Sequence, residues 1–189
     1  VINTDATNRT YAGSVAGPVN LVRSGPNTLS FVSSNSHTGT TLINGGGTTL
    51  VSDGTFSGTS AIDINYATLT LDNNAGFNDL TNRVNNAAPI TLRGGTLAFQ
   101  GRAQTASTET VGAVTLAQGN SFINSVVGGT GINSADLTLT SLNRAVGGGT
   151  VNFTAATAGQ IGSSSRILTP MINGVSTATV GGGLTNNII

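Results

Sequence analysis

The chain has 189 residues, enough for one domain with its own hydrophobic core, so length alone requires no second domain. Charged residues make up only 7% of it and balance to a formal net charge of zero, whereas hydrophobic residues make up 37%, which is not the composition of a disordered protein. The basic residues are all arginines and lie singly, which disfavours a nucleic-acid partner because phosphate binding needs clustered positive charge.

Other features of the composition exclude further classes of protein. There is no cysteine, which excludes disulfides and thiolate metal sites. No segment approaches the roughly 20 apolar residues of a membrane-spanning helix. The opening VINTDATNRT is neither basic nor apolar enough for a signal peptide, so we expect that the signal of an exported protein was removed or lies outside this sequence.

Short strands separated by turns begin at the N-terminus and set the pattern of the chain. Residues 1–18 carry scattered apolar residues and end at a Gly-Pro turn, which predicts one or two short strands. Residues 19–51, VNLVRSGPNTLSFVSSNSHTGTTLINGGGTTLV, then alternate apolar and polar residues between clusters of Gly, Asn, Ser and Pro. This period of two predicts strand, turn, strand, with no room for a helix.

The same stretch carries a motif with a recognisable spacing. Its residues are Leu21, Val22, Arg23, Ser24, Gly25, Thr28, Leu29, Phe31, Asn35, Thr38, Gly39, Thr41, Asn44, Gly45 and Leu50. The motif resembles the autotransporter-associated β-strand repeat, and residues 60–154 resemble, less specifically, the looser strand repeats that accompany it. This chain has His37 where the family more often carries an aromatic residue such as tyrosine. The resemblance implies a right-handed parallel β-solenoid within a long secreted or surface-attached bacterial protein.

The middle of the chain continues the alternation with one interruption. Ile62 and Ile64, then Leu69 and Leu71, alternate with polar residues and predict two half-buried strands. Residues 77–84 break the pattern, because apolar residues there are spaced by three and four. That spacing permits one short helix near residues 78–84, and a loop with anchored apolar residues fits equally well.

Apolar groups of four to seven residues recur from residue 90 to residue 153. With roughly 20 to 25 residues per coil, the chain would make about eight or nine coils, and at about 4.8 Å per coil a rod of about 40 Å. We expect corner positions to be filled by glycines, as in Gly45-Gly46-Gly47, and by asparagines whose amides bond to those of the next coil. Pro170 predicts an interrupted or edge strand between residues 161 and 172, because proline lacks the N–H of a strand ladder.

Both ends of the chain lack a polar or helical cap, although solenoids usually carry one at each end. We therefore expect the chain to be a segment of a longer protein or of an assembled fibre, joined end to end. The residues predicted for this assembly interface are Val1, Ile2, Leu184, Ile188 and Ile189.

Few residues suggest chemistry. His37 is the only histidine and is interpreted as a turn or surface residue. Asp63, Asp72 and Asp79 offer oxygen ligands for calcium but lack the spacing of a calcium loop, so solvated turn aspartates are the preferred interpretation. Glu109 with an aspartate could in principle form the carboxylate pair of a glycosidase, but the chain has no tryptophan, no lysine and only two tyrosines to build a sugar cleft.

Together these observations predict one all-β domain over residues 1–189, a right-handed parallel β-solenoid, with a β-sandwich as the alternative fold. We predict an extracellular structural module of a bacterial cell surface, either a stalk repeat or a filament subunit, with no catalytic, cofactor or metal site. The alternative function is an adhesin or glycan-binding passenger domain, for which Tyr11, Tyr66 and His37 are the candidate contacts, and a polysaccharide-active enzyme ranks below it. The expected partner is a second copy or a neighbouring part of the same protein.

Overall fold

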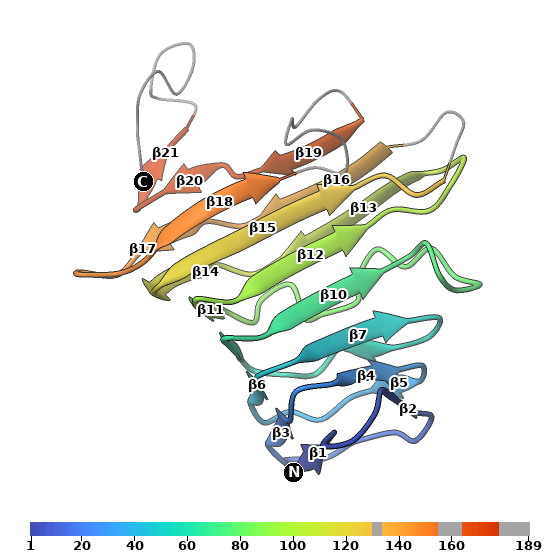
Figure 1. The fold of residues 1–189 in the computed structure, drawn as a ribbon. Coiled ribbons are helices and arrows are strands. Elements are labelled where there is room, and N and C mark those ends of the chain that lie inside the picture. The colour runs from blue at the N-terminus through green and yellow to red at the C-terminus, as the bar shows by residue number, and fades with distance from the viewer. Residues whose placement is uncertain (130–133, 155–163, 178–189) are drawn as a thin grey trace.

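The computed structural model describes residues 1–129, 134–154 and 164–177, and within them the chain forms strands and no helix (Figure 1). The strand pairs there are parallel except for one short hairpin near the C-terminal end. Parallel pairing of this extent confirms the predicted all-β class and is compatible with a β-solenoid. It does not fit the antiparallel sheets of a β-sandwich.

Two long sheets contain most of the strands. Sheet I has nine strands in the order β1 (Ile2–Asn3), β3 (Leu21–Ser24), β6 (Thr41–Asn44), β9 (Ile62–Asn65), β11 (Ile90–Arg93), β14 (Val114–Gln118), β17 (Leu142–Arg144), β20 (Met171–Ile172) and β21 (Val175–Ser176). Sheet II has seven strands and faces the viewer in Figure 1. In chain order they are β2 (Arg9–Tyr11), β4 (Thr28–Phe31), β7 (Gly47–Val51), β10 (Thr68–Asp72), β12 (Thr96–Gln100), β15 (Asn120–Val126) and β18 (Thr150–Thr154).

A third face contains the strands that follow sheet II and precede the next strand of sheet I. It consists of the pair β5 (Ser34–Asn35) and β8 (Thr55–Phe56), and of the sheet β13 (Ala106–Val111), β16 (Ser134–Leu139) and β19 (Ser165–Leu168). The chain therefore visits sheet I, sheet II and the third face in turn. We call each such pass a level. In chain order, β1 and β2 form level 1, β3 to β5 level 2, β6 to β8 level 3, β9 and β10 level 4, β11 to β13 level 5, β14 to β16 level 6 and β17 to β19 level 7, and β20 begins level 8.

The levels widen from the N-terminus to the C-terminus, as Figure 1 shows. Leu21 pairs with Thr41, 20 residues later, whereas Leu142 pairs with Ile172, 30 residues later. The strands of sheet II lengthen correspondingly, from three residues in β2 to seven in β15. The predicted 20 to 25 residues per coil thus describes the first levels and underestimates the later ones.

The hydrophobic core is a column of equivalent side chains stacked from level to level. In sheet I, Ile62, Ile90, Val114 and Leu142 are paired in register and are almost completely buried. Because the side-chain period of a strand is two, the residues next to these core residues along each strand point outward. Each buried Leu or Ile stabilises the fold by about 1.5–3 kcal/mol relative to an exposed one, so the stack of levels is the main source of stability.

Two segments, residues 78–84 and the region around Pro170, interrupt the regular strands. Residues 78–84 form no helix; they belong to a loop, and only Val84 pairs with Phe56 of β8. A helix there was the wrong alternative, since side chains from neighbouring levels satisfy the loop's backbone groups, as described below. The expected interruption at Pro170 is confirmed, because β19 ends at Leu168 and β20 begins at Met171.

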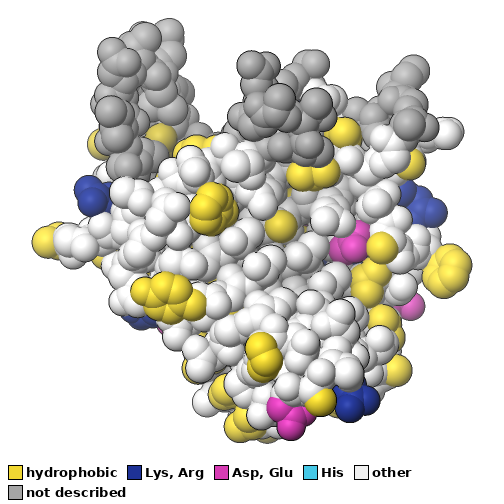
Figure 2. Space-filling model, viewed as in Figure 1, with side chains coloured by type: hydrophobic (Ala, Val, Ile, Leu, Met, Phe, Trp, Pro, Cys, Tyr) yellow, Lys and Arg dark blue, Asp and Glu magenta, His cyan; other side chains and the backbone are white. Residues whose placement is uncertain are grey.

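Figure 2 shows the molecule from the side of sheet II, and most of this face is polar but uncharged. The outward residues of its central strands are mainly threonines and serines, as in Thr28 and Ser30 of β4 and Thr68 and Thr70 of β10. Charged side chains are few on this face. The scarcity of charge on this face therefore follows from the low charge content of the sequence.

Candidate functional site

A buried polar cluster lies where the third face is interrupted at level 4. There a loop over residues 73–88 takes the place of a strand. Glu109, on β13 of level 5, points into the interior and is only 1% exposed. Its Oε1 accepts hydrogen bonds from the backbone N–H groups of Arg83, at 2.9 Å, and of Val84, at 3.4 Å. The carboxyl group thus bonds to backbone donors that a neighbouring strand would otherwise satisfy.

Arg83 is completely buried and ties the loop to level 3. Its Nε donates to Oδ1 of Asn73 at 2.6 Å, and its Nη1 donates to the carbonyl oxygens of Gly54, at 2.9 Å, and Ser52, at 3.2 Å. Its Nη2 donates to the carbonyl oxygen of Asn78 at 3.3 Å. Burying a guanidinium is costly unless its donors are bonded, and these four bonds lower that cost.

The electrostatics of the cluster are dominated by burial. Burial raises the pKa of Glu109 to about 8, although the backbone N–H groups of Arg83 and Val84 and the charge of Arg83 act in the opposite direction. Burial also lowers the pKa of Arg83, against the attraction of the surrounding carboxyl groups. Those carboxyl groups are Glu109, Asp72, Asp79 and Asp53.

Of the three aspartates weighed as calcium ligands and preferred as turn residues, Asp72 ends β10 and Asp79 lies in the loop that follows it. Oδ1 of Asp72 accepts from the backbone N–H groups of Asn74 and Ala75, at 2.8 and 2.9 Å. Oδ1 of Asp79 accepts from Nδ2 of Asn73, at 2.7 Å, and from the hydroxyl of Ser107, at 2.8 Å. These carboxylates fold the loop and hold it against level 5.

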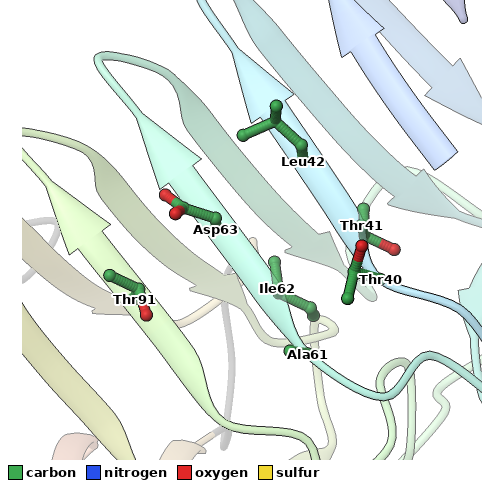
Figure 3. A pocket seen from close by; sticks show the side chains of 7 residues that line it. All are labelled: Thr40, Thr41, Leu42, Ala61, Ile62, Asp63 and Thr91. Carbon is green, nitrogen blue, oxygen red and sulfur yellow. The ribbon is translucent and has the colours of Figure 1, made fainter. Parts of the chain in front are cut away.

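The third of these aspartates, Asp63, lies elsewhere, on the outer face of sheet I, within β9 and not in a turn. It forms an ion pair with Arg93, with Oδ2 and Nε 3.0 Å apart, and its Oδ1 has no hydrogen-bond partner among the described residues. Asp63 lies beside Leu42 and Thr91 in a shallow hollow of about 320 Å³, shown in Figure 3. In the described parts of the chain, no three His, Cys, Asp or Glu residues come together as a metal site would require.

His37 is completely buried, so the prediction of a turn or surface position was wrong about its exposure. Its Nε2 lies 2.8 Å from the hydroxyl of Thr41, and its ring packs edge-on against Phe56 with centroids 5.6 Å apart. Burial lowers the pKa of His37. The edge-on contact of the imidazole with Phe56 is of the kind that an aromatic ring makes in a protein core.

Arg23, which sequence reasoning passed over, is also completely buried. Its Nη1 donates to the carbonyl oxygens of Gly25 and Gly45, and its Nη2 donates to the hydroxyl of Thr4 at 3.0 Å. The guanidinium therefore joins three successive levels at the corner between sheets I and II. A signal for this was present in the sequence, because Arg23 follows the inward residue Leu21 by two positions.

The two tyrosines have different surroundings. Tyr11 packs edge-on against Phe31, with ring centroids 5.4 Å apart, at the N-terminal end of the core. Tyr66 lies at the corner between β9 and β10 and is 65% exposed. The structure therefore leaves Tyr66 available to a ligand, whereas His37 is enclosed.

Of the predicted assembly interface, the structure describes the residues at the N-terminal end. β1 and β2 are the edge strands of sheets I and II, Val1 is exposed, and the half-buried Ile2 packs against the core. Leu184, Ile188 and Ile189 lie outside the described residues. At the other end of sheet I, the hairpin β20–β21 turns at Asn173 and Gly174 and places an antiparallel strand on the edge.

Within the described parts of the chain there is no helix suited to span a membrane. Comparisons with protein-family models, with curated proteins and with solved structures each give no match to this chain.

Proposed function

We propose that this chain is a right-handed parallel β-solenoid that serves as a structural module of an extracellular bacterial surface protein, as a stalk repeat or as a filament subunit. The observation that carries the proposal is the stacking of parallel levels along one axis over a continuous core. The resemblance of residues 19–51 to the autotransporter-associated repeat supports the handedness and the surface location.

Side chains join the levels as well as backbone ladders. Nδ2 of Asn65 donates to Oδ1 of Asn44 at 2.8 Å, which is the amide stacking that the sequence predicts. On other faces of the levels, the hydroxyls of Ser34 and Thr55 lie 3.0 Å apart, and the hydroxyl of Thr150 donates to Oδ1 of Asn120 at 2.9 Å. A pull along the axis would load many such bonds together, which suits a stalk.

The low charge supports the same role. Residues in register lie about 4.8 Å apart, so like charges at equivalent positions of successive levels would repel one another. Two ion pairs among the described residues join opposite charges of neighbouring levels, Arg93 with Asp63 and Arg166 with Asp136. On this proposal the buried Glu109 is a structural group of the loop over residues 73–88 and not a catalytic acid.

End-to-end association is part of the proposal. The outer sides of β1 and β2 present backbone N–H and C=O groups that can pair with another edge. Contact between two different ends need not close, and its repetition gives a filament. The same edge would serve equally for a neighbouring segment of a longer protein.

Electron microscopy and light scattering of the chain over a concentration series test this. We expect fibres whose axial repeat is near the length of the rod, about 40 Å. Ile2→Lys places a cation at the edge and is expected to prevent association. Val146→Lys, at a fully exposed site between β17 and β18, is the matched control and should assemble normally. Monomers at every concentration would refute the assembly proposal.

A further inference from the structure

The corners between sheets I and II share a feature of the backbone, a positive φ. In levels 2 to 7, each corner contains a residue with positive φ. These residues are Gly25, Gly45, Gly46, Tyr66, Gly94, Gly119 and Gly147. Glycine adopts positive φ without steric cost, so its presence at five of the six corners follows from the turn itself.

Tyr66 is the exception, with φ of 44°. A side chain in this region brings Cβ close to the following carbonyl oxygen and costs about 1–2 kcal/mol. Bulky residues there are genuine outliers, and such outliers cluster at sites that contact ligands. The corner of level 4 thus carries an aromatic side chain at a position where the fold favours glycine.

The ring of Tyr66 packs on the corners of the next two levels. A Cβ added to Gly94 would lie 2.8 Å from Cε1 of Tyr66, and one added to Gly119 would lie 3.8 Å from its hydroxyl oxygen. The ring therefore covers the two glycines, while 65% of the residue stays exposed. Its hydroxyl has no hydrogen-bond partner among the described residues.

The surroundings of the ring are polar and mostly uncharged. Asn65 precedes Tyr66 and bonds to Asn44 of the level before, and the exposed Gln118 and Asn120 flank Gly119. Arg93, which directly precedes Gly94, forms an ion pair with Asp63. A single exposed ring whose neighbouring corner residues carry amide side chains is not the contiguous apolar patch that marks a protein partner.

We propose that Tyr66 is an aromatic platform that binds a neutral saccharide, with the C–H face of a sugar ring stacked on the tyrosine and its hydroxyls bonded by the neighbouring amides. Seating the ring on Gly94 and Gly119 holds it in place before binding, so little conformational freedom is lost on association. The bonding groups are donors and acceptors, as sugar hydroxyls require. This role adds to the structural function and does not depend on end-to-end assembly.

Intrinsic fluorescence gives a direct measurement, because the chain has two tyrosines and no tryptophan. In the Tyr11→Phe variant all tyrosine emission comes from Tyr66. The variant is first applied to an immobilised panel of neutral oligosaccharides of glucose, galactose, mannose and N-acetylglucosamine. The best-bound soluble oligosaccharide is then titrated, and we expect a saturable change in emission. Absence of binding across the panel would overturn the proposal.

Two substitutions separate binding from folding. Tyr66→Gly and Tyr66→Asn both suit positive φ, and Asn173 shows that asparagine is accepted in a turn of this chain. We expect affinity to fall about tenfold or more in both, with a melting temperature equal to or above that of the wild type. Phe77→Ala, which removes the 90% exposed ring of the loop over residues 73–88, should bind as the wild type does. Unchanged affinity in the Tyr66 variants, whatever their melting temperature, would overturn the proposal and assign the ring to packing alone.

Discussion

At the scale of single residues, Glu109 makes the stability of the fold depend on pH. Its pKa is about 8 in the folded protein and near 4.5 when the chain is unfolded. Between these values the folded state binds the proton more tightly than the unfolded state does. The contribution of Glu109 to the free energy of unfolding is therefore complete below about pH 4.5 and is lost as the pH rises toward 8. At about 1.4 kcal/mol per unit of pKa shift, the loss amounts to several kcal/mol.

Glu109→Gln tests this prediction, because glutamine keeps an oxygen acceptor for the backbone N–H groups of Arg83 and Val84 but does not ionise. We expect the free energy of unfolding of the variant to fall less than that of the wild type between pH 5 and pH 8, measured by urea denaturation. Asp5→Asn, at an exposed carboxylate, is the control and should follow the wild type. Parallel curves for Glu109→Gln and the wild type would contradict the assignment.

The buried charged and polar residues show where single-residue reasoning failed. Arg23 and Glu109 each stand two positions from an inward apolar residue, Leu21 and Val111, so the period of two had already placed them inside. Their residue types argued against burial, because charged side chains are rarely buried unless they are paired. The partners are backbone groups supplied by other levels, and no local pattern in the sequence reveals them.

At the scale of elements, the corners between sheets I and II depend on glycine for two separable reasons. Gly46 has φ of 57°, and a Cβ there would lie 2.5 Å from the carbonyl oxygen of Gly25 and 2.7 Å from Nη1 of Arg23. Gly147 has a similar φ of 68°, but a Cβ there would meet no atom of the described residues within 4 Å. The first corner is restricted by conformation and by space, and the second by conformation alone.

We therefore expect Gly46→Ala to destabilise the fold by about 2–4 kcal/mol, the sum of backbone strain and a displaced neighbouring corner. Gly147→Ala should cost only the strain, about 1 kcal/mol. Thermal and urea unfolding of both variants give the comparison. Equal losses would mean that the close approach of neighbouring levels at Gly46 relaxes without cost.

Residues 78–84, within the loop over residues 73–88, are the segment that the sequence left open between helix and loop. Its apolar residues have helical spacing, but Val84 is buried while Phe77 is 90% exposed, so they do not form one buried stripe. Arg83 and Asn73 instead bond to each other, Asn73 bonds to the carbonyl oxygen of Leu80, and Arg83 reaches the carbonyl oxygen of Gly54 in the level before. Tertiary hydrogen bonds, rather than local propensity, determine its conformation.

At the scale of the whole molecule, each level packs mainly on its two neighbours, so stability should vary along the axis. Among the described strands, β1 and β2 have a neighbour on one side only, whereas β10 lies between β7 and β12. Hydrogen–deuterium exchange followed by mass spectrometry should show fast exchange in residues 1–20 and the slowest exchange around β10 and β12. Uniform protection along the chain would show that the molecule opens only as a whole.

The sequence by itself determined the class of fold. The period-two alternation, the turn clusters and the scarcity of charge predicted short stacked strands, and β3, β4, β9 and β10 lie on the expected apolar groups. These features are local, because strand alternation and turn chemistry depend on a few neighbouring residues.

Only the tertiary structure decided which residues meet across levels that are 20 to 30 positions apart in the chain. It enclosed His37 against Phe56, placed the carboxyl group of Glu109 on the backbone of residues 83 and 84, and seated Tyr66 on Gly94. Each of these contacts depends on the length of the intervening level, which varies along the chain. The pairing register, and with it the polar interior and the exposed aromatic ring, could therefore not be derived from local sequence patterns.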